Sequence, residues 1–278
     1  MAAIYEPQGA AREYSPLAMN YITGCDHGCV YCYVPRMMKR FRSDYVHSDV
    51  YIKEESKLIK EVIASAKKHQ NSKTQVFLSF LTDPYSHFNK DTKLTRRVLE
   101  ILLEYKIPVS ILSKGGFNIL EDIDVIKKFG HNIQIGGSLT FTNEADSKKW
   151  ERNSSSPKER FETLKLLNKE AIKTWASLEP VIFPNQSLEI MEITKDYVDG
   201  YKIGKLNHFK KHEDKFDWTK FLRESVSIMR KNNELFYIKK DLLTYKDYDL
   251  FLERHETDMD FMALKSWVEN TEKTPINA

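Results

Sequence analysis

The sequence has no apolar run long enough to cross a membrane, and it has very little cysteine. Its longest apolar stretches, such as Val76–Leu81, are far shorter than the roughly 20 residues that a transmembrane helix needs. The N-terminal segment MAAIYEPQGAAREY has no apolar stretch of the kind found in secretory signals. We therefore expect a cytoplasmic protein with no membrane partner. In such a reducing compartment, clustered cysteines bind metal or do redox chemistry more often than they form structural disulfides.

The sequence also lacks a marked excess of charge of either sign. It has 43 lysines and arginines against 40 aspartates and glutamates, which gives a net charge of +3. No overall field therefore favours a polyanionic partner, and any affinity for nucleic acid must come from a local patch. With 278 residues, of which 41% are hydrophobic, the chain can bury the core of one barrel or of two smaller domains.

What the sequence does contain is a regular alternation of β-rich and helical segments. The β-rich runs are Leu17–Ile22, Gln75–Leu81, Pro108–Ser113, Asn132–Leu139, Thr174–Ile182 and Asp199–Ile203. The helical patterns are Glu54–Lys68, Thr92–Tyr105, Asn118–Phe129, a segment that starts after Ser156, Leu188–Tyr197 and Trp218–Asn232. Strands that alternate with helices pair in parallel, either in an open doubly wound sheet or in a complete or partial barrel. The first strand is not followed by Gly-x-Gly-x-x-Gly, which argues against a dinucleotide-binding fold.

Two segments bear on where the helices and domains begin and end. Ser156-Pro157-Lys158-Glu159 has the residues of a capping box, with proline at the first helical position. Beyond Lys239 the alternation of strands and helices stops. We therefore expect residues 1–240 to form the α/β domain and residues 241–278 to form a C-terminal helical extension, with a helix around Asp258–Asn270.

Polar residues follow each predicted strand after the first. They lie in the segments Thr82-Asp83-Pro84-Tyr85, Ser113-Lys114-Gly115-Gly116, Ser138-Leu139-Thr140, Ser177-Leu178-Glu179-Pro180 and Gly204-Lys205-Leu206-Asn207. In parallel barrels the carboxyl ends of the strands meet at one rim, and this rim carries the active site. The sequence therefore predicts one site that collects these side chains.

All three cysteines of the chain lie in one loop after the first predicted strand. Cys25, Cys29 and Cys32 have the spacing C-x3-C-x2-C. Thiolates are soft ligands that suit iron–sulfur clusters and zinc. A four-iron cluster held by three thiolates keeps one iron open for a small molecule, and Gly24 and Gly28 would allow the loop to wrap tightly around it.

Two alternatives use the same cysteines. With His27 or His47 as a fourth ligand they would form a structural zinc site, although such sites usually draw their ligands as two separated pairs. Without a metal they would be a cluster of redox-active or inert thiols. In the iron–sulfur alternative, Tyr31 would form an aromatic wall beside Cys32.

The cysteine spacing belongs to a larger set of motifs. The set comprises Asn20-Tyr21, Gly24-Cys25-x-His27-Gly28-Cys29-x-Tyr31-Cys32-Tyr33, Thr82-Asp83-Pro84-Tyr85, Leu94-Thr95-Arg96, Ser113-Lys114, Ser138-Leu139-Thr140, Trp150-Glu151 and Asp217-Trp218. With these motifs, residues 4–242 resemble the radical S-adenosylmethionine (radical SAM) superfamily, and within it the spore photoproduct lyase-like branch, often labelled DNA-repair photolyase-like. The resemblance implies a partial (βα)6 TIM-type barrel with parallel strands, followed by a short C-terminal appendage.

The resemblance also implies a cofactor set and a role for each site residue. Cys25, Cys29 and Cys32 would hold a 4Fe–4S cluster. S-adenosylmethionine would bind at the open iron, where one electron cleaves it to methionine and a 5′-deoxyadenosyl radical that abstracts hydrogen from the substrate. The remaining implied contacts are Thr82 and Asp83 with the methionine part, Lys114 with its carboxylate, Ser138 as a hydrogen-bond donor, Glu179 with the ribose or amino group, and Tyr31, Tyr33 and Tyr85 in the pocket wall. The chain has no cysteine left for a second cluster, so the electron would come from a flavodoxin- or ferredoxin-type donor.

One feature of the branch is missing from this sequence. Spore photoproduct lyase uses a further cysteine near the end of the second strand to return a hydrogen atom to the product radical. Here the segment Val76–Asp83 has no cysteine. The resemblance therefore implies the cofactor chemistry and leaves the substrate open.

Two basic runs are compatible with a nucleic-acid substrate. Arg36–Arg42 has four cations around Phe41, and Lys202–Lys220 has lysines and histidines mixed with acidic residues. Such runs bind phosphates or are simply solvated helix faces. We therefore weigh an enzyme that acts on a nucleobase in DNA or RNA, or on another hydrogen-donating substrate, against a nucleic-acid-binding protein whose zinc or structural cluster does no radical chemistry.

Overall fold

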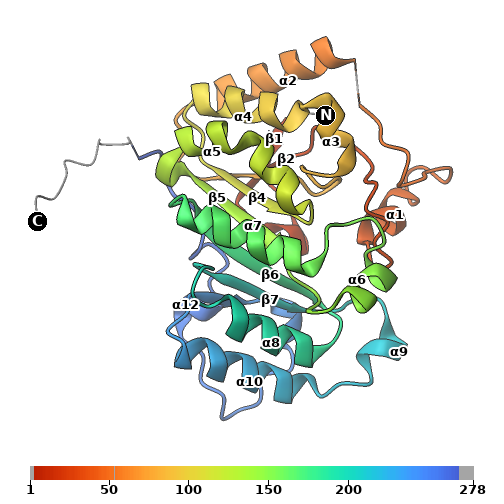
Figure 1. Cartoon of the computed structure of the whole chain (residues 1–278), viewed down its shortest axis with the longest axis vertical. Coiled ribbons are helices and arrows are strands. Elements are labelled where there is room, and N and C mark those ends of the chain that lie inside the picture. The colour runs from red at the N-terminus through yellow and green to blue at the C-terminus, as the bar shows by residue number, and fades with distance from the viewer. Residues whose placement is uncertain (1–2, 53, 269–278) are drawn as a thin grey trace, which may run out of the picture.

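The structure is a computed structural model that describes residues 3–52 and 54–268. Its centre is an eight-stranded sheet whose strands follow one another in chain order (Figure 1). The strands are β1 (Ile4–Tyr5), β2 (Leu17–Met19), β3 (Val76–Leu78), β4 (Val109–Ser113), β5 (Ile133–Ser138), β6 (Lys173–Val181), β7 (Tyr201–Lys205) and β8 (Phe236–Ile238). β1 is antiparallel to β2, and all later neighbours pair in parallel. Over the described residues the sheet does not close, so the predicted α/β fold with a partial TIM-type barrel is confirmed.

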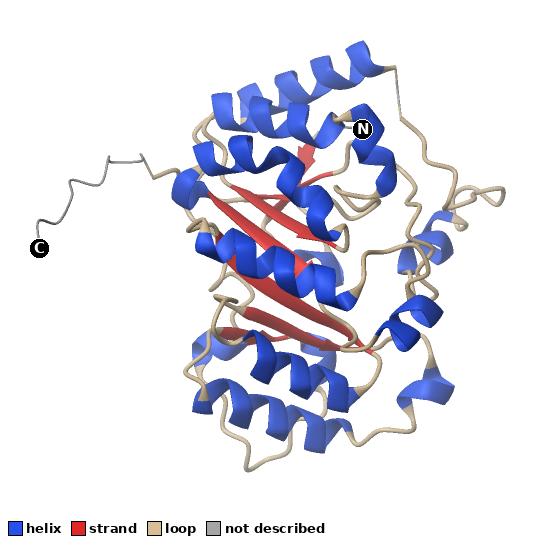
Figure 2. Cartoon of the chain, viewed as in Figure 1, coloured by secondary structure: helices blue, strands red, loops and turns tan. Residues whose placement is uncertain are grey.

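Helices flank this sheet and connect its strands (Figure 2). The α-helices are α1 (Tyr33–Met38), α2 (Glu55–Lys68), α3 (His87–Thr92), α4 (Leu94–Glu104), α5 (Ile123–Lys128), α6 (Glu144–Trp150), α7 (Pro157–Lys169), α8 (Pro184–Thr194), α9 (Lys210–Glu213), α10 (Trp218–Lys231), α11 (Lys240–Leu243) and α12 (Arg254–Thr257). The 3-10 helices are η1 (Gly9–Glu13), η2 (Gly116–Asp122) and η3 (Gly130–Asn132). The six predicted strand–helix units correspond to β2 to β7, which are followed by α2, α4, η2 with α5, α7, α8 and α10 respectively.

The capping and the apolar stripes explain why these helices form and which face they bury. Ser156 Oγ accepts a hydrogen bond from the Glu159 N–H at 3.2 Å, and Pro157 occupies the first turn of α7. Among the described residues the return bond from the Ser156 N–H to the Glu159 side chain is not formed, so only half of the predicted capping box is present. Leu164 and Leu167 of the same helix are buried. Their burial, repeated on the other connecting helices, fills the space between helices and sheet with two large apolar clusters, one over β2 to β5 and one over β6 to β8.

Three predictions about elements need correction. β1 has only two residues, and β8 is followed only by the four-residue α11 and not by a long helical pattern, so the sequence predicted neither strand. The helix expected over Asn118–Phe129 is divided into η2 and α5. The helix expected around Asp258–Asn270 is wrong over 258–268, where turns and one isolated bridge follow the four-residue α12; residues 269 and 270 lie outside the described part.

The segment after α12 packs against the sheet through single contacts and not through a helical face. Met262 is buried next to Trp175 and Tyr237. The Gln75 N–H donates to the Leu264 carbonyl at 3.0 Å. A helix with a continuous apolar stripe is therefore not required to bury this segment. The assignment of residues 241–278 to a separate extension stays a prediction. Among the described residues, no helix is both long and apolar enough to cross a bilayer, and the cytoplasmic location also stays a prediction.

Candidate functional site

The cysteine loop joins β2 to α1 and is anchored on both sides. The Cys25 N–H donates to the His47 carbonyl at 2.8 Å. Cys29 forms an isolated bridge with Glu151, and Cys32 is the residue that precedes the first turn of α1. The three thiols are free and partly buried. The loop is therefore held in place by backbone bonds to two segments that are distant in the sequence.

Gly24 and Gly28 give the loop its tight turns. Both have positive φ, +97° and +63° respectively, a region that L-residues with a side chain rarely adopt. At Gly24 a Cβ would also lie 2.7 Å from the Asp49 carbonyl oxygen, so the loop passes directly against the following segment. Both glycines therefore turn the loop tightly, and its wrapping around a cluster stays a prediction.

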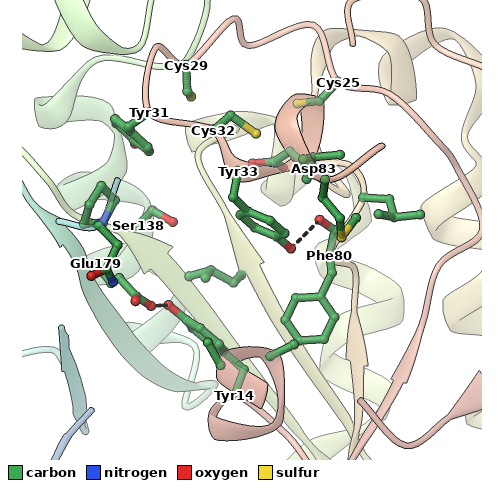
Figure 3. A pocket seen from close by; sticks show the side chains of 18 of the residues that line it. Tyr14, Cys25, Cys29, Tyr31, Cys32, Tyr33, Phe80, Asp83, Ser138 and Glu179 are labelled. Carbon is green, nitrogen blue, oxygen red and sulfur yellow. Dashed lines mark hydrogen bonds between the residues drawn. The ribbon is translucent and has the colours of Figure 1, made fainter. Parts of the chain in front are cut away.

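The loop covers one side of a cavity of about 670 Å³ at the carboxyl ends of the strands. Figure 3 shows the cysteine side chains on one side of this cavity and Tyr14 on the other. The predicted site residues that line it are Cys25, Cys29, Tyr31, Cys32, Tyr33, Thr82, Asp83, Lys114, Ser138 and Glu179. Tyr85 is the exception, because its side chain is buried in the apolar core and is not among the described lining residues. The fold thus brings the predicted set together, while the role of each residue stays a prediction.

Asp83 connects the cysteine loop to the end of β4. Its carboxylate accepts hydrogen bonds from Ser113 Oγ at 2.6 Å and from the Lys114 N–H at 2.6 Å. Its Oδ2 lies 3.1 Å from Nε2 of the buried His27. Burial alone would raise the pKa of Asp83, but His27 and these donors outweigh burial and hold the pKa well below its usual value. Asp83 therefore stays ionised and braces the loop.

The contacts of the two histidines bear on the zinc alternative. The ligand atoms of Cys25, Asp26 and His27 lie within 4.8 Å of one another. His27 Nδ1 lies 3.2 Å from the Asn153 carbonyl, whereas its Nε2 lies 3.1 Å from Asp83 Oδ2 and makes no hydrogen bond within the described residues. His47 Nε2 lies 3.5 Å from Cys32 Sγ. Both histidines therefore remain candidates for the fourth ligand of the zinc alternative.

The thiols suit a metal centre better than free nucleophiles. Burial, with a smaller contribution from Asp83, raises the pKa of Cys25 to about 12. Burial also raises the pKa of Cys29 to about 12, although Lys114 opposes this shift. Thiols of this kind become thiolates when a metal replaces the proton, so the donor set fits a metal or cluster and not a reactive thiol pair.

Tyr31, Glu151 and Arg160 form a buried network behind the last two cysteines. Tyr31 donates its hydroxyl proton to Glu151 Oε1, and Arg160 Nη2 pairs with Glu151 Oε2 at 2.6 Å. Arg160 Nη1 also donates to the Ser138 carbonyl at 2.9 Å. The network joins the cysteine loop, α6 and the end of β5, and it fixes Tyr31 as a wall of the cavity.

The Lys114 ammonium and the Thr82 hydroxyl have no hydrogen-bond partner among the described residues. The Lys114 ammonium lies 5.7 Å from the centre of the Tyr31 ring. Within residues 3–52 and 54–268, no hydrogen bond or ion pair holds it. Burial would lower its pKa, but Cys29 and Glu151 outweigh burial and raise it. Thr82 Oγ1 is buried and has no hydrogen-bond partner there either. Both groups are thus free to bind an anionic or polar ligand in the cavity.

Glu179 is held by residues that the sequence analysis missed. Its Oε2 accepts a hydrogen bond from the Tyr14 hydroxyl and lies 2.5 Å from Lys239 Nζ (Figure 3 shows the contact with Tyr14). Lys239 directly follows β8, so recognition of that strand would have placed it at the rim with the other polar residues. Tyr14 follows a 3-10 helix and carries no comparable signal.

The second basic run is not one surface. Lys202 and Lys205 belong to β7 and are buried. Lys202 Nζ donates to the backbone carbonyls of Glu13 and Tyr14 at 2.6 and 2.9 Å. Burial, with a contribution from the neighbouring Lys239, lowers the pKa of Lys202 to about 7. Only the part of the run beyond β7 can contact a large partner.

Comparison with known proteins identifies a family. The family profile described as "Radical SAM superfamily" matches residues 19–198. The uncharacterized protein MJ0683 of Methanocaldococcus jannaschii is 31% identical over 240 residues, which cover 84% of this chain and 88% of that protein. The uncharacterized protein ORF301 of Acidianus two-tailed virus is 25% identical over 192 residues, which cover 66% of this chain and 62% of that protein.

Two solved structures share the fold. Spore photoproduct lyase complexed with dinucleoside spore photoproduct superimposes with a TM-score of 0.62 at 13% identity, over 85% of this chain and 78% of its own. SuiB of Streptococcus suis bound to its precursor peptide SuiA gives a TM-score of 0.60 at 13% identity, over 82% of this chain and 49% of its own. At these low identities the two structures show a shared fold. This shared fold agrees with the resemblance of the sequence to the spore photoproduct lyase-like branch.

Proposed function

The chain belongs to the radical SAM superfamily, and on that premise we propose that it holds a 4Fe–4S cluster on Cys25, Cys29 and Cys32. Membership implies an iron–sulfur cluster and S-adenosylmethionine as cofactors, and the four-iron type is part of the proposal. When bound, the two cofactors supply a 5′-deoxyadenosyl radical that takes a hydrogen atom from the substrate, after one electron has cleaved S-adenosylmethionine. The observation that carries the proposal is the convergence of three free thiols, the unpaired Lys114 ammonium and the unsatisfied Thr82 hydroxyl on one cavity.

The residues of the chain bind and orient the reactants. The Lys114 ammonium lies over the Tyr31 ring, and no hydrogen bond or ion pair within the described residues holds it, so we assign it to the carboxylate of S-adenosylmethionine. Thr82 and Ser138 contribute hydroxyl groups to the lining of the cavity. Asp83 acts indirectly, because its carboxylate is occupied by His27, Ser113 and the Lys114 backbone. This division of roles keeps the ammonium of Lys114 free while its backbone is fixed.

Glu179 lines the cavity with its carboxylate already partnered. Tyr14 and Lys239 hold it in one orientation, and a ligand hydroxyl or amino group would therefore meet a fixed acceptor. We keep Glu179 as a contact for the ribose or the amino group of the cofactor. Loss of Lys239 would leave its charge without a counterion.

We propose a nucleobase in DNA or RNA as the substrate. Tyr14, Tyr33, Phe77 and Phe80 line the cavity, and aromatic rings of this kind stack on bases. A base inside a duplex would first have to be flipped out to reach them. The name of one structural neighbour includes a dinucleoside ligand and that of the other a peptide, so the neighbours support two substrate classes. The aromatic lining is what favours the base.

The first experiment tests the cofactor chemistry. Protein purified without oxygen is analysed for iron, sulfide and zinc, and is then incubated with dithionite and S-adenosylmethionine. We expect about four irons per chain, as a 4Fe–4S cluster requires, and formation of 5′-deoxyadenosine. Cys29→Ala should lose both, whereas Lys57→Ala on α2, outside the cavity lining of the described residues, should keep both. One zinc per chain without iron would instead establish the zinc-binding alternative.

The second experiment tests the substrate class. Oligonucleotides and peptides with deuterium at carbon are added in turn, and deuterium in 5′-deoxyadenosine is measured by mass spectrometry. We expect transfer from an oligonucleotide. Transfer from a peptide alone would reject the nucleobase and leave the cofactor chemistry intact.

A further inference from the structure

The cluster has no internal source of electrons. All three cysteines of the chain lie in the loop from Cys25 to Cys32, so no second cysteine-bound cluster is available to relay an electron. This inference rests on the proposed function, in which each cleavage consumes one electron. The electron must therefore arrive from another molecule that docks close to the cysteine loop.

The structure offers one charged surface directly beside that loop. α1 begins at Tyr33, the residue after Cys32. Its inner face, with Val34 and Met37, lines the cavity. Its outer face and the turn that follows carry exposed cations. We call this set, Arg36, Lys39, Arg40, Phe41 and Arg42, the α1 basic patch.

The cations of the α1 basic patch are not neutralised by the protein. Arg42 Nε lies 3.9 Å from Asp44 Oδ1, at the limit of an ion pair. Over the described residues, no ion pair or side-chain hydrogen bond holds Arg36, Lys39 or Arg40. Phe41 is 80% exposed between them. Arg and Phe are enriched in protein interfaces, so an exposed aromatic ring among unpaired cations has the composition of a docking surface.

We propose that the α1 basic patch docks an acidic one-electron carrier protein of the flavodoxin or ferredoxin type. The carrier loses one electron to the cluster and is itself oxidised by one electron, and no proton or group is transferred. Opposite charge steers such a carrier to the patch, and redox complexes of this kind need only a small interface. Because α1 follows the last cysteine directly, docking there brings the two redox centres close.

A second exposed basic segment has a different position. Lys210, Lys211 and Lys215 lie on and after α9, and Glu213 and Asp214 interrupt them. Figure 1 shows α1 and α9 well apart, with α6 between them. The two basic segments thus differ in their distance from the cysteines. Because α1 begins directly after Cys32, it is the better docking site for the redox partner.

The test compares two reductants on the same variants. The triple charge reversal Arg36→Glu, Lys39→Glu, Arg40→Glu is compared with the wild type and with a control reversal on α2, Lys60→Glu, Lys67→Glu, Lys68→Glu, whose side chains are exposed. Each protein, loaded with its cluster, receives either reduced flavodoxin in limiting amount or dithionite. Cluster reduction is followed spectroscopically, and 5′-deoxyadenosine is measured separately. Binding of fluorescently labelled flavodoxin and of a labelled oligonucleotide is measured as well.

We expect the patch reversal to slow flavodoxin-driven reduction by about tenfold or more at low salt, and to weaken flavodoxin binding similarly. The difference should shrink as salt screens the charges. Dithionite, a small anion that needs no docking site, should reduce both reversal variants at the wild-type rate. Equal flavodoxin-driven rates in the patch and control variants would overturn the proposal, and so would a patch reversal that weakens only oligonucleotide binding. If the cluster is reduced but no 5′-deoxyadenosine forms, the proposed function fails while the docking surface stands.

Discussion

At Gly24 the backbone has a φ of +97° and runs against the segment that returns from α1, so that a Cβ would lie 2.7 Å from the Asp49 carbonyl oxygen. Gly9 also has a positive φ, +60°, but a Cβ there would meet nothing within 4 Å. The two glycines therefore separate the cost of the backbone conformation from the cost of a collision.

We expect Gly24→Ala to bind much less iron than Gly9→Ala after reconstitution. Both variants carry the conformational cost of about 1–2 kcal/mol for a side chain at positive φ. Only Gly24→Ala must also displace the loop that carries Cys25. Iron content per chain measures the displacement of the loop, and thermal unfolding of the iron-free proteins measures the conformational cost. Equal iron content in the two variants would contradict the idea that the loop depends on this close approach.

At the scale of elements, α7 secures the cysteine loop from behind. Arg160 of α7 and Glu151 at the end of α6 are both almost fully buried and pair at 2.6 Å. Lys127 and Glu170 form an ion pair too, but their side chains are about half exposed (51% and 47%). A buried pair depends on its partner far more than an exposed one, because an isolated charge cannot be hydrated in the interior.

Arg160→Met should therefore destabilise the iron-free protein by about 3–5 kcal/mol, the range for removing one partner of a buried ion pair. The comparison variant Lys127→Met should cost less than about 1 kcal/mol. Urea unfolding of both variants gives the values. Similar losses in the two would mean that Glu151 is accommodated by Tyr31 alone.

The elements also show what local sequence patterns can and cannot predict. The start of α7 was predicted correctly because the Ser156 cap and Pro157 act within one turn. β8 was missed because no helical pattern follows it to mark a further strand–helix unit, although the parallel pairing with β7 holds it in the sheet. The helix expected around Asp258–Asn270 failed because its apolar residues make separate contacts with the sheet, such as that of Met262 with Trp175 and Tyr237.

At the scale of the whole molecule, the cavity is lined both by the cysteine loop and by residues in or next to the strands from β3 to β8. A ligand that fills it should stabilise the folded chain in proportion to its occupancy. At 100 times its dissociation constant, S-adenosylmethionine should add about 2.7 kcal/mol, seen as a rise of several degrees in the melting temperature.

This rise should appear in the iron-loaded wild type and be lost or strongly reduced in Cys29→Ala, since the cluster forms one side of the proposed cofactor site. Differential scanning calorimetry under anaerobic conditions measures it. An equal rise in Cys29→Ala would show that S-adenosylmethionine binds without the cluster, which would contradict the proposed arrangement.

The sequence by itself determined the features that act over a few residues: the three cysteines at C-x3-C-x2-C, the glycines that turn their loop, and the polar residues that end the strands. These depend on local geometry and ligand chemistry, and they led to the superfamily before the fold was known. Only the tertiary structure decided how the rim residues are partnered. Glu179 meets Tyr14, 165 residues earlier, and Lys239, 60 residues later, because the order of the strands in the sheet brings these segments together. No local pattern encodes contacts at that separation, since they form only when the whole sheet is in place.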